Sequence, residues 1–259
     1  MRVTRYRLTT RHEGVSFKAV IVADLHDFPY AHMLPVIADI QPDVILVPGD
    51  LTEYITDKSH PNTHRRPGLG FLAEAVRIAP TFYSLGNHEI GAYHESIRRS
   101  HIDLSKSGGI SGAWREVIEA SGATLLDDGF VTWQNITIGG LGSGLLGEMR
   151  IPRHEWIEQM TAQKGYKILL CHHPEYDQKF LQEYDLDMVV SGHAHGGQWR
   201  IFGRGVYAPD QGVFPRYTAG VYHDRLVVSR GVVNTVRPIP RICNPCELVV
   251  VEVKGQDPS

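Results

Sequence analysis

The stretch Lys18-Ala-Val-Ile-Val-Ala-Asp-Leu-His26 is a short apolar run that ends in two side chains able to bind metals, Asp24 and His26. Four further apolar runs end in the same way. They are Val44–Val47 before Asp50, Phe82–Leu85 before Asn87, Ile168–Leu170 before His172, and Met188–Val190 before His193 and His195. Parallel strands buried on both faces read as continuous aliphatic runs. The five runs therefore predict an α/β core with parallel strands.

The polar side chains after these runs form one candidate site, because ligands of such sheets lie beyond the carboxyl ends of the strands. The candidate metal ligands are Asp24, His26, Asp50, Asn87, His172, His193 and His195. Oxygen and imidazole donors without a thiolate suit manganese, iron or zinc better than calcium. Seven donors exceed the four of a structural zinc site, and two ions that share one carboxylate account for them.

A dinuclear site of this kind favours an anionic ester as substrate. Two ions about 3.5–4 Å apart can hold a bridging hydroxide and clamp the attacking and leaving oxygens of a displacement. Their four positive charges are offset by Asp24, Asp50 and the hydroxide, which leaves about one positive charge for the substrate. The pattern therefore indicates hydrolysis of a phosphate ester.

The order of the motifs resembles the calcineurin-like metallophosphoesterases. Asp-x-His, Gly-Asp, Gly-Asn-His-Glu, a strand-end His and Gly-His-x-His follow one another between Asp24 and His195. The run Ser191-Gly-His-Ala-His-Gly-Gly-Gln198 is similar to that of a bacterial subgroup of this superfamily, as are Ser229-Arg-Gly231 and Asn244-Pro-Cys-Glu-Leu248. The subgroup often has Asn-Pro-Pro-Glu in the last motif, so Cys246 is a departure in a segment that we expect to be structural.

The resemblance implies a role for each of these residues. Asp24, His26 and His195 would hold one ion, Asn87, His172 and His193 would hold the other, and Asp50 would bridge them. The position of the ligand after the fourth strand favours His172 over His173. His88 would act beside the scissile ester, by stabilising the phosphoryl oxygens or protonating the leaving oxygen. Glu89 would orient a neighbour.

We therefore predict a dinuclear-metal-dependent phosphodiesterase or phosphatase in which a metal-bridging hydroxide attacks phosphorus in line. Some relatives cleave the pyrophosphate of a UDP-sugar lipid or act on nucleotides, so a pyrophosphohydrolase is the alternative. A catalytically silent binding scaffold on the same fold fits less well, because all seven ligands and His88 are present. A dinuclear amide hydrolase on another fold does not fit Gly-Asn-His-Glu.

The remaining pattern predicts one domain over residues 1–259, built as two facing mixed β-sheets flanked by helices in a four-layer α/β/β/α sandwich. Helices are expected at Met33–Ile40, Phe71–Ile78, Ala113–Ala120, His154–Gln163 and Glu175–Tyr184. Past Gly122, the segments Phe130–Gln134 and Ile136–Gly139 read as a hairpin into the second sheet, followed by strands at Leu226–Ser229 and Glu247–Val253.

Several segments around the site could form its walls. The polar loops 57–70 and 91–112 are expected near the active face, and Arg200, Arg204 and Arg216 could pair with substrate anions, although solvated arginines are expected for at least two of them. Gly196 and Gly197 would let the backbone pass close to the second sheet. The apolar residues of the tail are Val206, Tyr207, Val213, Phe214 and Tyr217. We interpret them as packing of the terminal sheet, with an apolar wall for a lipid as the alternative.

Composition limits the partners. A formal charge of −3 and a pI near 6.5 give no basic footprint for duplex nucleic acid, so a small phosphorylated substrate is expected. Arginines interrupt the N-terminal region and no apolar segment of signal or membrane length precedes the first predicted strand at Lys18, which favours a cytoplasmic chain without a membrane span. Cys171, Cys243 and Cys246 form no disulfide framework. Mn²⁺ is the expected metal, with Fe or Zn²⁺ possible, and the oligomeric state is not encoded in these motifs.

Overall fold

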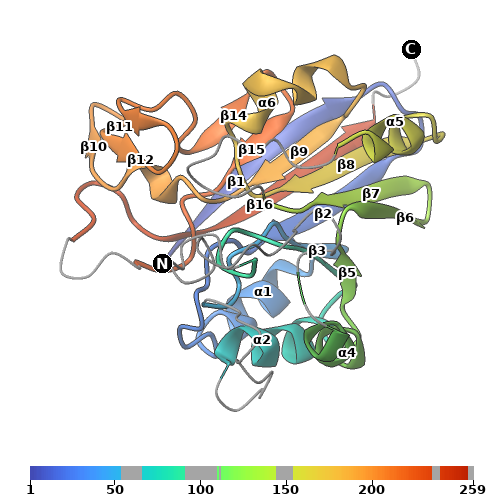
Figure 1. Cartoon of the computed structure of the whole chain (residues 1–259), viewed down its shortest axis with the longest axis horizontal. Coiled ribbons are helices and arrows are strands. Elements are labelled where there is room, and N and C mark those ends of the chain that lie inside the picture. Colours follow the sequence, from blue (N-terminus) through green and yellow to red (C-terminus); the bar gives the residue numbers. More distant parts are fainter. Residues whose placement is uncertain (54–65, 91–109, 111, 144–153, 235–239, 256–259) are drawn as a thin grey trace, which may run out of the picture.

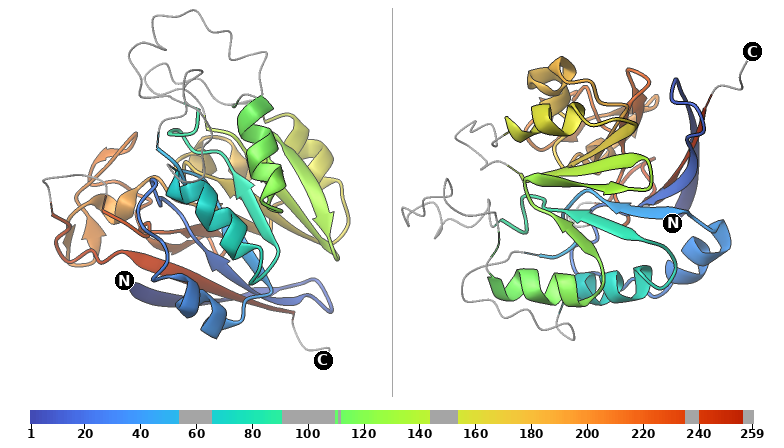
Figure 2. Two further views of the ribbon diagram at one scale, coloured as in Figure 1. Left: turned by 90° about the horizontal axis from the view of Figure 1, so that it is seen from below. Right: turned by 90° about the vertical axis from the view of Figure 1, so that its right-hand side faces the viewer.

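The computed structural model describes residues 1–53, 66–90, 110, 112–143, 154–234 and 240–255. Two six-stranded mixed sheets lie face to face, and helices cover the outer side of each (Figures 1 and 2). This arrangement confirms the predicted α/β sandwich with two facing sheets.

The first sheet has the strand order β1-β16-β2-β3-β4-β5. Its strands are β1 Arg2–Thr10, β2 Ser16–Ile21, β3 Val44–Val47, β4 Thr81–Ser84, β5 Thr124–Leu126 and β16 Glu247–Gly255. β2, β3, β4 and β5 are mutually parallel, so their carboxyl ends lie at one edge of the sheet. β16 runs antiparallel to β2 and parallel to β1.

The second sheet has the strand order β14-β15-β9-β8-β7-β6. Its strands are β6 Gly129–Trp133, β7 Ile136–Leu141, β8 Tyr166–Cys171, β9 Met188–Ser191, β14 Gly220–Tyr222 and β15 Leu226–Val228. β6 and β7 form the predicted antiparallel hairpin, whereas β7, β8, β9 and β15 are parallel. Two small hairpins stand apart from both sheets, β10 Arg200–Ile201 with β11 Arg204–Gly205, and β12 Tyr207–Ala208 with β13 Gly212–Val213.

The helices divide between the two outer layers. The helical elements are α1 Leu34–Ile40, α2 Pro67–Ala75, α4 Gly112–Ala120, α5 Trp156–Thr161, α6 Tyr176–Lys179, η2 Leu181–Glu183 and η3 His195–Gly197. Buried side chains of α1, α2 and α4 pack on the first sheet, and those of α5, α6 and η2 pack on the second. Among the described residues, no helix is long and apolar enough to cross a membrane.

Alternation along the strands builds the core between these layers. In β2, Ala19 and Ile21 face the second sheet, whereas Val20 packs with the helices of the first. In β8, Ile168 and Leu170 likewise join the cluster between the sheets, while Leu169 faces α5 and α6. The central strands of both sheets are thus buried on both faces, which explains why they read as continuous apolar runs.

Three expectations about local structure were wrong. A nine-residue strand, β1, precedes the predicted first strand at Lys18. It lies at the edge of the first sheet, where one side meets solvent, so arginines alternate with less exposed residues in it. Helix α2 begins at Pro67, inside the predicted loop 57–70, because proline fits the first turn of a helix. The predicted helix Glu175–Tyr184 is split at Phe180, whose φ of −159° is not helical.

Other predictions concern residues outside the described part. Residues 57–65 of the first polar loop and nearly all of the second, 91–109 and 111, lie outside the described residues. The cysteines match the sequence analysis, since Cys171 is buried and none of the three forms a disulfide.

Candidate metal centre

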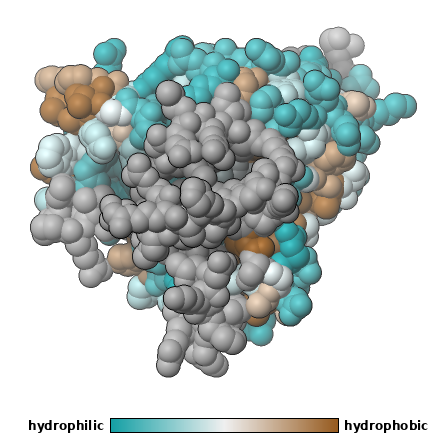
Figure 3. All heavy atoms as spheres, in the orientation of Figure 1, coloured by the Kyte–Doolittle hydropathy of each residue, from teal (hydrophilic) through white to brown (hydrophobic). Residues whose placement is uncertain are grey.

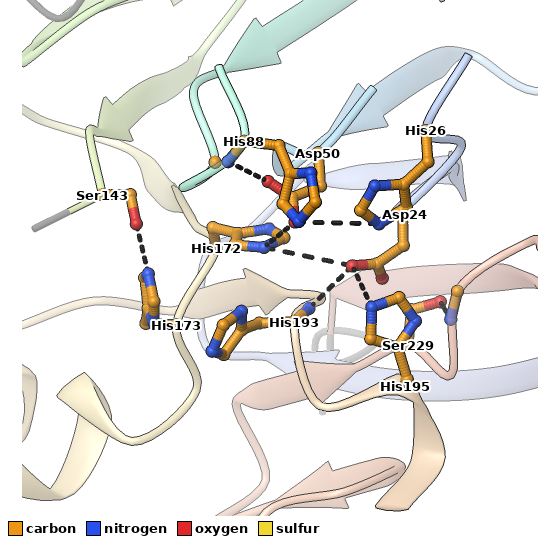
Figure 4. Close-up of polar contacts among 12 residues, drawn as sticks. Asp24, His26, Asp50, His88, Ser143, His172, His173, His193, His195 and Ser229 are labelled. Carbon is orange, nitrogen blue, oxygen red and sulfur yellow. Dashed lines mark hydrogen bonds and ion pairs between the residues drawn. The ribbon is translucent and has the colours of Figure 1, made fainter. Parts of the chain in front are cut away.

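The carboxyl ends of five strands bring the seven predicted donors together. β2, β3 and β4 lead into Asp24 and His26, Asp50, and Asn87, while β8 and β9 lead into His172, His193 and His195. Figure 4 shows the side chains of Asp24, His26, Asp50, His172 and His195 directed toward one another between the two sheets. All seven are buried except His195, which is partly exposed.

The donors form two groups within ligand distance of a common point. Asp24, His26 and His195 offer atoms that lie within 4.8 Å of one another, and so do Asp50, His172 and His193. These groups coincide with the two ligand sets that the family resemblance implies, apart from Asn87, an amide whose side chain is buried at the end of β4.

Asp50 lies between the two groups. Its Oδ2 is 3.0 Å from Nε2 of His172, in the second group, and 3.7 Å from Nε2 of His26, in the first. Its Oδ1 accepts a hydrogen bond of 2.9 Å from the backbone N–H of His88. The carboxylate is thus fixed by one oxygen and directs the other toward both groups, as a bridging ligand requires.

The buried donors have few hydrogen bonds. Seven buried side-chain atoms of the donors have no hydrogen-bond partner among the described residues. They are Oδ2 of Asp24, both side-chain polar atoms of Asn87, and the two ring nitrogens of His26 and of His172. Leaving a buried polar atom unpaired costs about 1–3 kcal/mol. A pair of divalent cations would satisfy these atoms, and the mixture of carboxylate, amide and imidazole donors fits manganese, iron or zinc.

Five of the seven donors have a left-handed backbone. Their φ angles are 57° for Asp24, 51° for His26, 50° for Asp50, 63° for His193 and 45° for His195. Such angles are uncommon for residues other than glycine and cost about 1–2 kcal/mol each. Strain of this kind clusters at functional sites, because it is retained only where the surroundings hold it in place.

Glycines let the donor loops pack against each other. A Cβ on Gly86 would collide with Oδ1 of Asp50, and one on Gly192 would come within 2.7 Å of Oδ2 of Asp24. Gly49, with φ of 119°, leaves room for the backbone of Gly86. The Gly-Asp, Gly-Asn and Gly-His pairs of the sequence are therefore steric requirements of the same site.

Glu89 organises the loops without facing the donors. Its buried carboxylate accepts hydrogen bonds from the backbone N–H groups of Asp50, Leu51, Thr52 and Gly86, at 2.7–3.0 Å. It thus joins the loop after β3 to the loop after β4. This geometry matches the expectation that Glu89 orients its neighbours.

His88 and Glu53 form a pair at the margin of the centre. Nδ1 of His88 lies 3.1 Å from Oε2 of Glu53, and its Nε2 lies 3.9 Å from Oδ2 of Asp50. Burial acts to lower the pKa of His88, but Asp50 and Glu53 outweigh it and raise the pKa above its usual value. Burial acts to raise the pKa of Glu53, yet His26 and His88 lower it to about 2. Sequence analysis missed Glu53, which follows its strand by six residues and carries no motif.

The neighbouring histidines 172 and 173 differ in their hydrogen bonds. Nδ1 of His173 bonds Oε1 of Glu175 at 3.0 Å, and its Nε2 bonds Oγ of Ser143, so both nitrogens have protein partners. His172 has no such partners and faces Asp50. Burial lowers the pKa of His173 to about 4. The contrast favours His172 as the ligand.

Two residues from the tail hold the ligand histidines from behind. Oδ2 of Asp210 accepts a hydrogen bond of 2.9 Å from Nε2 of His193, which leaves Nδ1 as the atom for a metal. Nη2 of Arg241 donates to Nδ1 of His195 at 3.1 Å. Burial lowers the pKa of His195 to about 3. Neither Asp210 nor Arg241 was predicted from the sequence, because nothing local marks a residue that acts through a distant histidine.

The tail glycines and Asn244 shape the loop after β9. Gly196 and Gly197 have φ of 68° and 78° and pack against Asn244 and Gly205, so they approach β11 and the C-terminal segment, not the second sheet as predicted. Nδ2 of Asn244 donates to the carbonyl of His195 at 2.7 Å, which supports a structural role for the motif that contains Cys246.

Carboxylate and histidine donors gathered at strand ends, in two groups that share one aspartate, are typical of hydrolases that use paired metal ions. The profile of the calcineurin-like phosphoesterase family matches residues 17–197 of this chain, and the chain belongs to that family. Membership makes it a metal-dependent phosphoester hydrolase, as the sequence predicted.

Bacterial relatives extend over nearly the whole chain. It is 25% identical over 259 residues to the uncharacterized metallophosphoesterase YkuE of Bacillus subtilis, an alignment that covers 94% of this chain and 81% of that protein. It is 26% identical over 269 residues to the phosphodiesterase YaeI of Escherichia coli, with coverage of 96% and 87%. A solved structure of the NAD nucleotidase NadN of Haemophilus influenzae aligns with a TM-score of 0.42 and 14% identity, over 70% of this chain and 39% of that one.

Proposed function

We propose that this chain hydrolyses phosphoesters with two divalent cations, Mn²⁺ being the expected pair. The observation that carries the proposal is the position of Asp50, whose Oδ2 lies within 3.0 Å of His172 and 3.7 Å of His26. One carboxylate oxygen thus reaches both donor groups. Asp24, His26 and His195 would hold one ion, and Asn87, His172 and His193 the other.

The bound ions would supply positive charge for the phosphoryl oxygens and a water acidic enough to attack phosphorus in line at neutral pH. The chain's own part is to fix the donors. Glu89 sets the backbone around Asp50, and Asp210 sets the tautomer of His193. Because these contacts exist in the folded protein, little reorganisation is required when a substrate binds.

His88 is proposed to act on the ester itself. Glu53 accepts a hydrogen bond from Nδ1 of His88, which orients the ring and favours its charged form. A protonated Nε2 at the margin of the site can stabilise charge on a phosphoryl oxygen or give its proton to the leaving oxygen. His88 would thus be a catalytic residue and Glu53 a positioning residue.

A small phosphodiester is the proposed substrate class, in keeping with the name of the Escherichia coli relative, a phosphodiesterase. A phosphomonoester and a pyrophosphate of a nucleotide or of a UDP-sugar lipid are the alternatives. The cytoplasmic location and the absence of duplex nucleic-acid binding stay predictions from composition. A silent scaffold is disfavoured, because the chain keeps every donor and His88.

The test is hydrolysis of a nitrophenyl phosphodiester and of the matching monoester by protein stripped with a chelator and reloaded with Mn²⁺. We expect turnover that requires the metal and is faster on the diester. Two bound ions without turnover of either ester would contradict the proposal for these substrate classes, and release of nitrophenol only from the monoester would replace the diester by a monoester.

A further inference from the structure

Two small hairpins beside the metal centre carry an exposed apolar surface. Among the described residues, eight large hydrophobic side chains are exposed, and seven of them lie in or next to these hairpins. They are Trp199, Ile201, Phe202, Tyr207, Val213, Phe214 and Ile242. We call these seven residues the hairpin patch. Figure 3 shows hydrophobic atoms gathered at the upper left, where Figure 1 places β10, β11 and β12.

Strand pairing makes this exposure a property of the fold. Tyr207 and Val213 stand opposite each other in the β12–β13 hairpin and are both exposed, at 53% and 66%, whereas the next residue, Ala208, faces inward and is fully buried. Trp199 and Ile242 are joined by an isolated bridge and are also both exposed. The expectation that Tyr207, Val213 and Phe214 pack in the terminal sheet was therefore wrong, although Tyr217 is buried.

The two phenylalanines of the patch are unfavourable for folding in two respects. Phe202 has φ of 49° and is fully exposed, and Phe214 has φ of 54° and is 77% exposed. Phe202 and Gly203 form the turn of the β10–β11 hairpin, where both central residues have positive φ and asparagine and glycine are the usual residues. An aromatic ring at such a position strains the backbone and buries nothing. Its use therefore lies in contact with a partner.

Charge indicates which partner. Residues 199–217 contain three arginines and a single acid, Asp210, and that acid is bonded to His193. Arg204 and Arg216 are exposed beside the apolar side chains, while Arg200 is bonded to Gly196 and Thr218. Aromatic tips flanked by arginines complement an anionic lipid surface, where rings enter the headgroup region and guanidinium groups bind phosphates.

We propose that the hairpin patch docks this protein on the surface of an anionic lipid bilayer. The Phe202 turn, together with the exposed Phe214 ring that follows β13, suits insertion between headgroups better than a flat contact with a second protein. The metal centre would lie close to the bilayer, because Asp210 and Arg241 connect the same segments to His193 and His195. Docking does not depend on the proposed hydrolysis, so each can fail without the other.

The experiment measures cosedimentation of the full chain with vesicles of phosphatidylcholine containing 30% phosphatidylglycerol, and with vesicles of phosphatidylcholine alone. The double variant Phe202→Asn and Phe214→Asn removes the rings and keeps residues that tolerate positive φ. We expect the unmodified chain to bind the anionic vesicles, and the affinity of the double variant for them to be lower by roughly tenfold or more. The circular dichroism spectrum should be the same for both, which shows that the variant is folded whether or not the chain hydrolyses the ester.

Substitution of two arginines tests whether the lipid surface must be anionic. Arg204→Ser with Arg216→Ser should weaken vesicle binding, whereas Arg7→Ser with Arg77→Ser removes the same charge from exposed side chains elsewhere and should not. Absence of binding by the unmodified chain, or equal binding by the asparagine variant, would overturn the proposal. Equal binding to phosphatidylcholine alone would contradict the requirement for anionic lipid. If the unmodified chain bound no vesicles but formed a dimer, and the asparagine variant were a monomer, the patch would be assigned to contact with a second copy.

Discussion

The strand-end loops and the hairpin patch depart from ordinary burial in opposite directions. The loops bury charged side chains, with Asp24, Asp50 and His172 at most 1% exposed. The hairpins expose aromatic rings, with Phe202 and Phe214 at 102% and 77%. Both regions also use left-handed backbone at residues other than glycine, namely five of the donors and both phenylalanines.

The difference shows what each region lacks within the chain. A cation bound inside the protein would stabilise the buried donors that have unpaired atoms. Contact with an outside surface would stabilise the exposed rings on strained backbone. Burying unpaired polar donors and exposing aromatic rings both lower the stability of the fold. Apolar residues at the donor positions and polar residues in place of Phe202 and Phe214 would raise it. Function therefore explains both regions better than stability does.

The largest expected effect is the loss of the shared carboxylate. Asp50→Ala should abolish turnover and lower the content of both ions, because Oδ2 of Asp50 lies 3.0 Å from His172 in one donor group and 3.7 Å from His26 in the other. Metal content by mass spectrometry and hydrolysis of the nitrophenyl diester measure the two effects. Asp39→Ala, an exposed aspartate on α1, is the control and should change neither. If the Asp50→Ala protein kept two ions and full turnover, Asp50 would be an ordinary buried ion-pair residue and not a metal ligand.

The next effect separates chemistry from metal binding. His88→Ala should lower kcat by about 10²–10⁴, the usual contribution of a general acid or base, while both ions stay bound. Steady-state kinetics and metal analysis check this. His32→Ala replaces an exposed histidine and should be neutral. A fully active His88→Ala protein would leave His88 without the proposed role.

Asp210 links the two regions, since it lies in the turn of the second hairpin and bonds a donor. Asp210→Ala should weaken binding of the ion on His193 by roughly 10–100-fold, as for other outer partners of metal-binding histidines. Asp210→Asn should give an intermediate value, because an amide oxygen still accepts the hydrogen bond. Competition with a chromogenic chelator measures affinity, and Asp224→Asn, an exposed aspartate nearby, is the matched control.

The pH dependence of metal binding tests whether His172 is protonated beside the buried Asp50 when no metal is bound. Burial acts to lower the pKa of His172, but Asp50 outweighs it and raises the pKa to about 9. A cation must displace that proton, so affinity should rise about tenfold from pH 7 to pH 8 and level off above pH 9. His195, with its pKa lowered to about 3, is already neutral there. Calorimetry in buffers of different ionisation enthalpy should show proton release at pH 7, and binding without proton release would contradict this account.

The smallest effect concerns the strained turn. Phe202→Asn should raise the free energy of unfolding by up to about 1 kcal/mol, because asparagine tolerates positive φ better than phenylalanine. Thermal unfolding measures this change. Gly203→Ala, at φ of 79° with open space around its Cβ, should instead destabilise the protein. A lower melting temperature for Phe202→Asn would mean that the ring contributes to folding after all.

The strands and the donors could be predicted because they share one local signal. A strand buried on both faces leaves an apolar run, and its end leaves a polar residue next to glycine, as at Gly49-Asp50 and Gly192-His193. The predicted strands at Val44–Val47 and Met188–Val190 agree with β3 and β9 within one residue. The two-sheet fold followed from the change of pattern after Gly122.

Two residues that act through a histidine, Glu53 and Asp210, could not be predicted, whereas Glu89 could because it stands inside a motif. Glu53 and Asp210 reach their histidines across loops, and nothing in their own neighbourhoods marks them. The hairpin patch was misread for a different reason. An apolar residue is expected inside, and only the pairing of Tyr207 with Val213 shows that this side of the hairpin faces outward. Strand β1 was missed because edge strands keep polar residues.

The place of β16 in the first sheet has a consequence for the order of folding. This strand lies between β1 and β2, pairing Val249 with Ile21 and Leu248 with Val3, so this side of the sheet joins residues separated by more than 220 positions. Contacts between such distant residues slow folding. On the ribosome, β1 and β2 would therefore stay unjoined until residues 247–255 have emerged, and the first sheet would be completed only then.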